Sequence, residues 1–233
     1  MKIISTVTVS ILTAGIALML GGCGASHQAR TAELKESLLI NPAIMVKGEE
    51  GEALYRYENP KADLKKYSKI IIDPVILSKA AITDATETEN YQKLVNNAFV
   101  FLNDELKKDY TVVTTPEPGA LRVQMGIIAA DSTSSVKTVL STIMPIGLGI
   151  SIVKYAATGT PMSVGDITVE LKITDAVSGE LLGAAIDKRV GGINIKGAWE
   201  SWMTADDALK YWAKRTAYVL CQKRGGTKSC VKP

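Results

Sequence analysis

The sequence predicts an α/β (α+β) fold in which helices pack on one mixed sheet of about five strands. Two observations predict this class. Short apolar runs rich in β-branched residues surround a segment with helical spacing, and a later hairpin pattern is followed by a second helical segment. A strand–helix–strand crossover followed by meandering strands packs both helices on the sheet. The predicted order is strand, helix, strand, strand, long loop, strand, strand, helix.

The first half of the predicted sheet begins at Lys69–Leu77, a short apolar run interrupted by Pro74. Proline cannot donate to a sheet ladder, so Pro74 predicts an edge position or a bulge. Residues 86–108 predict a helix that Thr86 or Thr88 caps. Its apolar residues recur at helical spacing: Tyr91, Leu94, Val95, Ala98, Leu102 and Leu106. Two further strands are expected at 110–115 and 121–130. The second alternates, with Leu121, Val123, Met125 and Ile127 on one face.

Residues 166–190 give the clearest hairpin pattern in the chain. Apolar and polar residues alternate before the turn DAVSG, in which Gly179 can adopt positive φ. The alternation places Ile167, Val169, Leu171 and Ile173 on one face and Thr168, Glu170, Lys172 and Thr174 on the other. The segment 181–190 returns as the partner strand.

A second helix is expected over 204–223. Thr204 can cap it, and Asp206 and Asp207 suit the positive end of a helix dipole. Lys223 and Arg224 suit its negative end. Its predicted buried stripe consists of Leu209, Trp212, Ala213, Thr216 and Leu220.

The N-terminus predicts export. Lys2 is followed by an apolar run from Ile3 to Leu20, as in a secretory signal peptide. The run ends in Leu-Gly-Gly before Cys23, which resembles a bacterial lipobox. The resemblance implies a diacylglycerol thioether on Cys23, cleavage before it, and acylation, commonly with palmitate, of the new amino terminus. The alternatives are a plain transmembrane anchor or a secretory signal with an incidental cysteine.

Lipidation would hold the mature chain firmly, because about two hydrophobic signals suffice for stable anchoring and this lipid carries three acyl chains. Gly24 stands where enterobacterial sorting rules place Asp for inner-membrane retention, so the outer membrane is expected, with the domain facing the periplasm. The sequence divides into a signal peptide (1–22), a tether and linker (23–50) and one periplasmic domain (51–233) with an apolar insertion (136–160). Within the linker, 32–40 could form a short helix.

Composition argues against nucleic acid as a partner. The chain of 233 residues has a formal charge of +3, and removal of residues 1–22 takes away only Lys2, which leaves +2 on 211 residues. Neither a basic stripe nor interleaved aromatic residues are present. The membrane, through the anchor, and an envelope protein are the expected partners.

Cys221 and Cys230 remain after lipidation of Cys23, as an even pair in an exported chain. A structural disulfide is the default there, because the compartment is oxidising. A redox pair or a metal site is the alternative, but the CxxC spacing and accompanying histidines are missing.

Two segments identify a family resemblance. LYRYENPKADLKKYSKIIIDPV and VGDITVELKITDAVSGELLGAAIDKR, in this order behind a lipobox, resemble the bacterial lipoprotein family known as domain of unknown function 3313. The resemblance implies a lipid-anchored envelope protein and supplies no catalytic residues. The element order is also similar to periplasmic domains of curli-secretion and penicillin-binding-protein-activator lipoproteins.

The sequence predicts no catalysis, cofactor or metal site. The one histidine, His27, lies in the tether, where a solvated linker residue is expected rather than a base or a ligand. Motifs for serine hydrolases, zinc proteases and nucleotide binding are missing. Carboxylates around the hairpin could do acid–base chemistry, but a solvated strand face with a turn-forming Asp175 is the simpler interpretation: Asp166, Glu170, Asp175, Glu180 and Asp187.

Two segments are candidates for an interaction surface. VLSTIMPIGLGISIV (139–153) is uncharged, too short for the roughly 20 residues of a spanning helix, and broken by Pro and Gly. It forms either core or an exposed contact for a partner or membrane, with Met144, Ile146, Leu148 and Ile150 as the contact residues. Trp199 and Trp202 lie in a predicted loop and form either a recognition patch or packing.

The function expected from these patterns is a non-catalytic binding or scaffolding domain for an envelope component. The alternative is a carrier of lipid or cell-wall ligands, or a hydrolase that uses carboxylates. An oligomeric secretion pore is a third hypothesis, based on the curli likeness alone.

Overall fold

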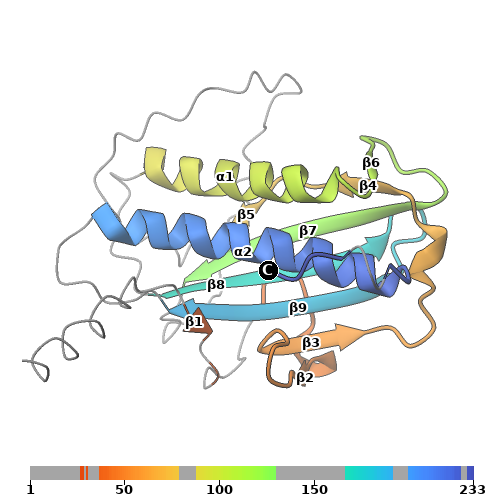
Figure 1. Ribbon diagram of the computed structural model, residues 1–233, viewed down its shortest axis with the longest axis horizontal. Coiled ribbons are helices and arrows are strands. Elements are labelled where there is room, and N and C mark those ends of the chain that lie inside the picture. Colours follow the sequence, from red (N-terminus) through yellow and green to blue (C-terminus); the bar gives the residue numbers. More distant parts are fainter. Residues whose placement is uncertain are drawn as a thin grey trace, which may run out of the picture.

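The computed structural model describes residues 27–28, 30, 37–78, 88–129, 166–190, 199–226 and 230–233 (Figure 1). The described strands form one mixed β-sheet. The described strands run in the order β2-β3-β9-β8-β7-β4-β6, with β1 paired to β9 and β5 paired to β7. Their bounds are β1 His27–Gln28, β2 Val46–Lys47, β3 Tyr55–Glu58, β4 Lys69–Ile72, β5 Ile76–Leu77, β6 Thr111–Val112, β7 Ala120–Ala129, β8 Asp166–Asp175 and β9 Leu181–Val190. The helices are α1, Thr88–Leu106, and α2, Trp199–Lys223, with short 3-10 turns η1, Pro42–Ile44, and η2, Leu64–Lys66.

The predicted α+β class and element order are confirmed. β4 pairs in parallel with β6 and β7 because α1 forms the crossover between them, whereas β7, β8 and β9 are antiparallel. The sheet has more strands than the five expected, because β1, β2 and β3 were missed and one predicted strand is split. Asp73, Pro74 and Val75 interrupt that strand between β4 and β5, which is how the sheet accommodates a residue that cannot donate.

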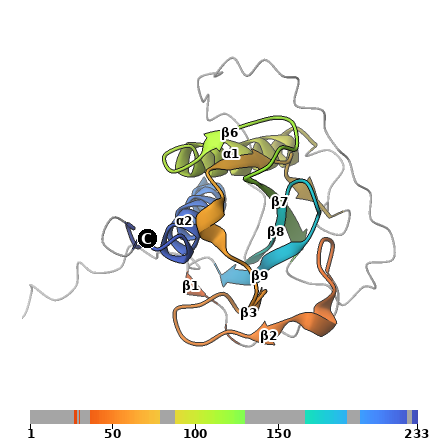
Figure 2. The same cartoon turned by 90° about the vertical axis from the view of Figure 1, so that its right-hand side faces the viewer.

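Both helices cover one face of the sheet and contact each other. Figure 2 shows the sheet curling around them, from β6 and β4 through β7 and β8 to β9 and β3. We call this the concave face. The predicted apolar faces of α1, β7, β8 and α2 meet there in the main core, whose deeply buried members include Tyr67, Ile70, Leu94, Leu102, Leu106, Leu121, Val123, Met125, Leu209 and Leu220.

The opposite, convex face is covered in part by residues 37–46, which we call the strap. Ile40 of the strap is buried against Ala184 and Ile186 of β9, and Leu39 and Met45 pack around them. A short helix was expected over 32–40; residues 38–40 are bends, and 32–36 lie outside the described residues. The sequence analysis placed this segment in the linker. It packs on the sheet because burial of its apolar side chains against the uncovered face is favourable.

The helix α2 begins earlier than predicted. Its backbone is helical from Trp199, so Thr204 lies inside the helix and is not its cap, and the predicted loop that carries Trp199 and Trp202 is part of α2. Residues 199–203 are mostly good helix formers and include neither Pro nor Gly, so the helix can begin at Trp199 instead of Thr204. The predicted buried stripe from Leu209 to Leu220 is confirmed.

Candidate functional site

A groove opens between α2 and the strands β9 and β3. Its cavity has a volume of about 350 Å³ and reaches beneath α2 to β8 and Met125 of β7. One wall is the α2 stripe that contains Trp212, Thr216 and Val219, and the opposite wall is β3. In Figure 1, α2 lies in front of β9, and β3 runs along the lower edge of β9.

Small residues on β9 create the hollow. Gly183 and Ala185 occupy concave-face positions, opposite Glu58 and Arg56 of β3. A Cβ built on Gly183 would find only the Tyr57 carbonyl oxygen nearby, at 3.7 Å, so the space above it is open. Large side chains at these positions would fill the groove, as the leucines do elsewhere on this face.

The floor of the groove is apolar. Six side chains from β7, β8, β9 and α2 form it: Met125, Val169, Leu171, Ile173, Leu182 and Leu220. All belong to the main core or pack against it, so the floor is rigid rather than a surface loop. A site of this kind favours an apolar ligand group and fixes it with a few polar groups at its edge.

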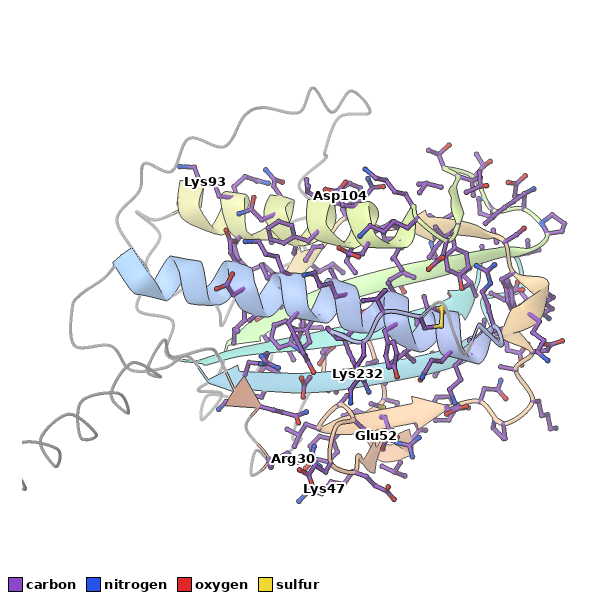
Figure 3. All side chains as sticks on the ribbon, viewed as in Figure 1. Arg30, Lys47, Glu52, Lys93, Asp104 and Lys232 are labelled. Carbon is purple, nitrogen blue, oxygen red and sulfur yellow. A yellow bond between two sulfur atoms is a disulfide. The ribbon has the colours of Figure 1, made fainter. Side chains whose placement is uncertain are left out.

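Charged residues form the rim. Arg56 pairs with Glu52 at 2.7 Å, and Lys223 of α2 reaches across the groove to Glu58 at 2.5 Å. The Arg215 guanidinium donates instead to the Gly51 carbonyl, at 2.6 Å. The Glu49 N–H first, then the nearby charges of Arg56 and Arg215, hold the pKa of Glu52 below its usual value. Figure 3 shows Glu52 beside β3, on the same side of the molecule as Arg30 and Lys47.

Asp187 closes one end of the groove and is buried. One oxygen accepts from the Trp212 indole N–H at 2.9 Å, and the other accepts from the Leu54 N–H at 3.1 Å and from the Gln28 amide. The sequence analysis placed Asp187 on a solvated strand face, which is wrong. Its position on the concave face and the indole of α2 remove it from water.

Glu170 is also buried, at 0 % exposure, and was also expected on a solvated face. The strap covers it: the Leu38 N–H donates to both carboxylate oxygens at 3.0 and 2.9 Å, and the Leu39 N–H donates to one at 2.9 Å. Burial raises the pKa of Glu170, and these hydrogen bonds, with one from Ser37, only partly oppose it. Glu170 therefore fastens the strap to the convex face and does not line the groove.

Asp175 forms the hairpin turn, as predicted. Its carboxylate accepts from the Val177 N–H at 3.0 Å and the Ser178 N–H at 2.8 Å, and Gly179 has φ 72°. The Ser178 N–H, followed by the Tyr67 hydroxyl, lowers the pKa of Asp175 to about 2. Burial, together with the hydrogen bond that its hydroxyl donates to Asp175 at 2.8 Å, raises the pKa of Tyr67.

The remaining hairpin carboxylates do not form a catalytic pair. Glu180 is exposed and accepts from the Asn59 amide at 2.9 Å. Asp166 begins β8, at the far end of that strand from Asp175. Glu170 and Asp187 lie on opposite faces of the sheet. Glu170 pairs with Ile186, the chain neighbour of Asp187, and successive residues of a strand face opposite sides.

The predicted disulfide joins Cys221 and Cys230, and it ties the C-terminal residues back to the end of α2. Cys23 and the apolar residues Met144, Ile146, Leu148 and Ile150 lie outside the described residues. Trp199 and Trp202 are placed in the first turns of α2 by their backbone alone. None of the described residues that line the groove was among the sequence-based candidates for an interaction surface.

Sequence reasoning missed the groove. Its signal was present in LLGAAIDKR, where small residues take the positions that alternation assigns to the buried face. Neither a cluster of metal-ligating residues nor a helix long and apolar enough to cross a membrane occurs in the part of the chain that the structure describes.

Solved structures that resemble this chain come from several bacteria. They include the PelC dodecamer from Paraburkholderia phytofirmans, at 8% identity and TM-score 0.35, which covers 66% of this chain and 90% of that one. A DUF4136 family protein from Bacteroides thetaiotaomicron, at 11% identity and TM-score 0.39, covers 73% of this chain and 95% of that one. A candidate lipoprotein from Caulobacter crescentus, at 12% identity and TM-score 0.34, covers 72% of this chain and 98% of that one. Likeness at this level carries no inference about function.

Sequence comparison gives one positive result. No curated protein matches the chain. A family model described as protein of unknown function (DUF3313) matches residues 35–216, which include every strand from β2 to β9, α1 and most of α2.

Proposed function

The chain belongs to the DUF3313 family, as the resemblance indicated, and on that basis we propose that it is a lipid-anchored binding module of the bacterial envelope. Cys23 carries the lipid, the outer membrane holds the anchor, and the domain faces the periplasm. The domain binds an envelope component in the groove between α2 and β9 and does no chemistry on it.

The groove carries this proposal. A rigid apolar floor of about 350 Å³ with a charged rim is suited to binding. The carboxylates nearest to it hold the fold together: Asp187 accepts three protein donors, and Glu52 and Glu58 pair with rim cations. A hydrolase would need at least one such group free for a substrate.

The test uses a photoreactive residue in cells that produce the full chain. Val219, which lines the groove, receives the photoreactive group in one variant, and Lys214, exposed on the same helix, receives it in the control. We expect a discrete adduct from position 219 and none from position 214, detected by the mass of the purified protein. Equal labelling at both positions, or none, would contradict a binding function for the groove.

A further inference from the structure

We infer that the groove holds one single-chain amphiphile with an anionic head group, such as a fatty acid or a lysophospholipid. The alkyl chain lies along the apolar floor, and the head group meets Arg215 at the rim. This inference rests on the proposed binding function and adds the chemical class of the ligand.

The shape of the groove selects one unbranched chain. Its α2 wall runs from Trp212 to Lys223, about 16 Å of helix. A cavity of about 350 Å³ spread over that length has a mean cross-section of about 20 Å². An α-helix is at least about 10 Å across, which is wider than this groove. A polymethylene chain, whose carbons pack at about 4 Å, fits.

The floor matches the chemistry of such a chain. The six floor side chains are aliphatic or thioether, and the polar Asp187 at the end has its oxygens occupied by Trp212, Leu54 and Gln28. A sugar or peptide on this floor would leave its own hydrogen-bonding groups unpaired. An alkyl chain has none, and its burial is favourable along its whole length.

The rim provides one cation for an outside anion. Lys223 and Arg56 contact the carboxylates of Glu58 and Glu52, respectively. Arg215 contacts a backbone carbonyl and the face of Tyr218, and its charge also acts on the nearby Glu52, but no salt bridge joins it to a carboxylate of the described residues. A guanidinium has five N–H donors, so donors remain for a carboxylate or phosphate at the mouth of the groove.

The test uses the full chain with Cys23→Ser, which keeps the domain and allows purification without detergent. The probe is cis-parinaric acid, whose fluorescence rises on transfer to an apolar site, and the competitors are palmitate, lysophosphatidylglycerol and neutral monopalmitoylglycerol. Ala185→Phe fills the groove, and Val219→Trp narrows it from the helix side in case the first variant unfolds. Ala43→Phe, at an exposed position, is the size control.

We expect saturable binding of the probe that both filling variants weaken at least about tenfold and that Ala43→Phe leaves unchanged. Arg215→Gln should weaken the anionic competitors about tenfold, the loss expected for one charge-assisted hydrogen bond, and monopalmitoylglycerol less than about twofold. Lys214→Gln, its neighbour on α2, should change neither.

Two results would overturn the inference: no saturable binding, or equal binding by the filling variants and the parent chain. Equal weakening of neutral and anionic competitors by Arg215→Gln would refute the role of the head group. If the photoreactive group at position 219 captures a polypeptide while the probe does not bind, the amphiphile is excluded and the binding function survives. If both experiments fail, the binding function fails too.

Discussion

At the scale of single residues, one carboxylate joins four segments of the chain. Asp187 of β9 accepts hydrogen bonds from Gln28 of β1, from Leu54 before β3 and from Trp212 of α2. These segments are far apart in sequence; the bonds from Leu54 and Trp212 are buried, and the bond from Gln28 is partly buried. Removal of the acceptor therefore leaves several donors without a partner at once.

Asp187→Asn should lower the free energy of unfolding by about 2–3 kcal/mol, because an amide offers one acceptor oxygen in place of two and leaves buried N–H donors unpaired. Urea unfolding followed by Trp fluorescence measures the loss. The control is Asp104→Asn on α1, whose side chain is 52% exposed and which should change stability by less than about 0.5 kcal/mol. Equal effects of the two substitutions would show that Asp187 is solvated after all.

Glu170 and Asp175, on the same strand, make opposite contributions to the pH dependence of stability. Because burial raises the pKa of Glu170, the folded protein binds the Glu170 proton more tightly than the unfolded chain does. The contribution of this group to stability is therefore lost as the pH rises above 4.5. Because hydrogen bonds lower the pKa of Asp175 from 3.8 to about 2, its contribution is present above that range and is lost as the pH falls through it.

Glu170→Gln should therefore gain stability relative to the parent chain as the pH rises from about 4.5 to 7, since the variant has no charge to bury. Urea unfolding across this range measures the difference between the two proteins. Glu49→Gln, at an exposed position, should run parallel to the parent chain. A difference that stays constant with pH for Glu170→Gln would contradict the burial of a proton-binding group beneath the strap.

At the scale of elements, the end of α2 is held by a cross-link. The Gly225 N–H and Gly226 N–H donate to the Gln222 and Cys221 carbonyls at 2.9 and 3.1 Å, with Gly225 at φ 90°, and the disulfide closes the following loop. Cys230→Ser should lower the free energy of unfolding by about 2–3 kcal/mol, from the entropy of a loop of this size. The thermal unfolding midpoint of the parent chain in the presence of reductant should match that of the variant in its absence. A parent chain unaffected by reductant would contradict this.

The start of α2 gives a second test at this scale. Because α2 begins at Trp199, Thr204→Ala replaces an interior residue by a better helix former and should leave stability within about 0.5 kcal/mol. If Thr204 were the cap that its sequence context suggests, the substitution would lower stability by about 1 kcal/mol. Chemical unfolding of the two proteins distinguishes these outcomes.

Elements with a strong periodic pattern were predictable, and those defined by distant partners were not. The apolar stripe of α1 and the alternation in β7 and β8 each encode a face, so the core followed from sequence. The strap and β3 carry weak local patterns, and both contact β9, which lies more than a hundred residues away in the sequence. That is why Glu170 and Asp187 were misassigned: alternation marks which side a residue faces, but not what covers that side.

At the scale of the whole molecule, attachment and folding should be separable. Cys23→Ser should abolish incorporation of labelled palmitate and move the protein to the soluble periplasmic fraction, while its unfolding midpoint stays that of the parent domain. The matched control is Cys221→Ser, which should retain the label and lose stability instead. Palmitate incorporation by the Cys23→Ser chain would place the lipid elsewhere.

The pairing of β1 with β9 would limit the distance between the domain and the membrane if Cys23 carries the proposed lipid. His27 and Gln28 are paired with Val190 and Arg189, and only three residues lie between Cys23 and His27. With the proposed lipid on Cys23, that leash extends at most about 14 Å, whereas a free chain to residue 50 would extend about 95 Å. The domain then stays next to its own bilayer and collects its ligand there, instead of reaching across the periplasm for it.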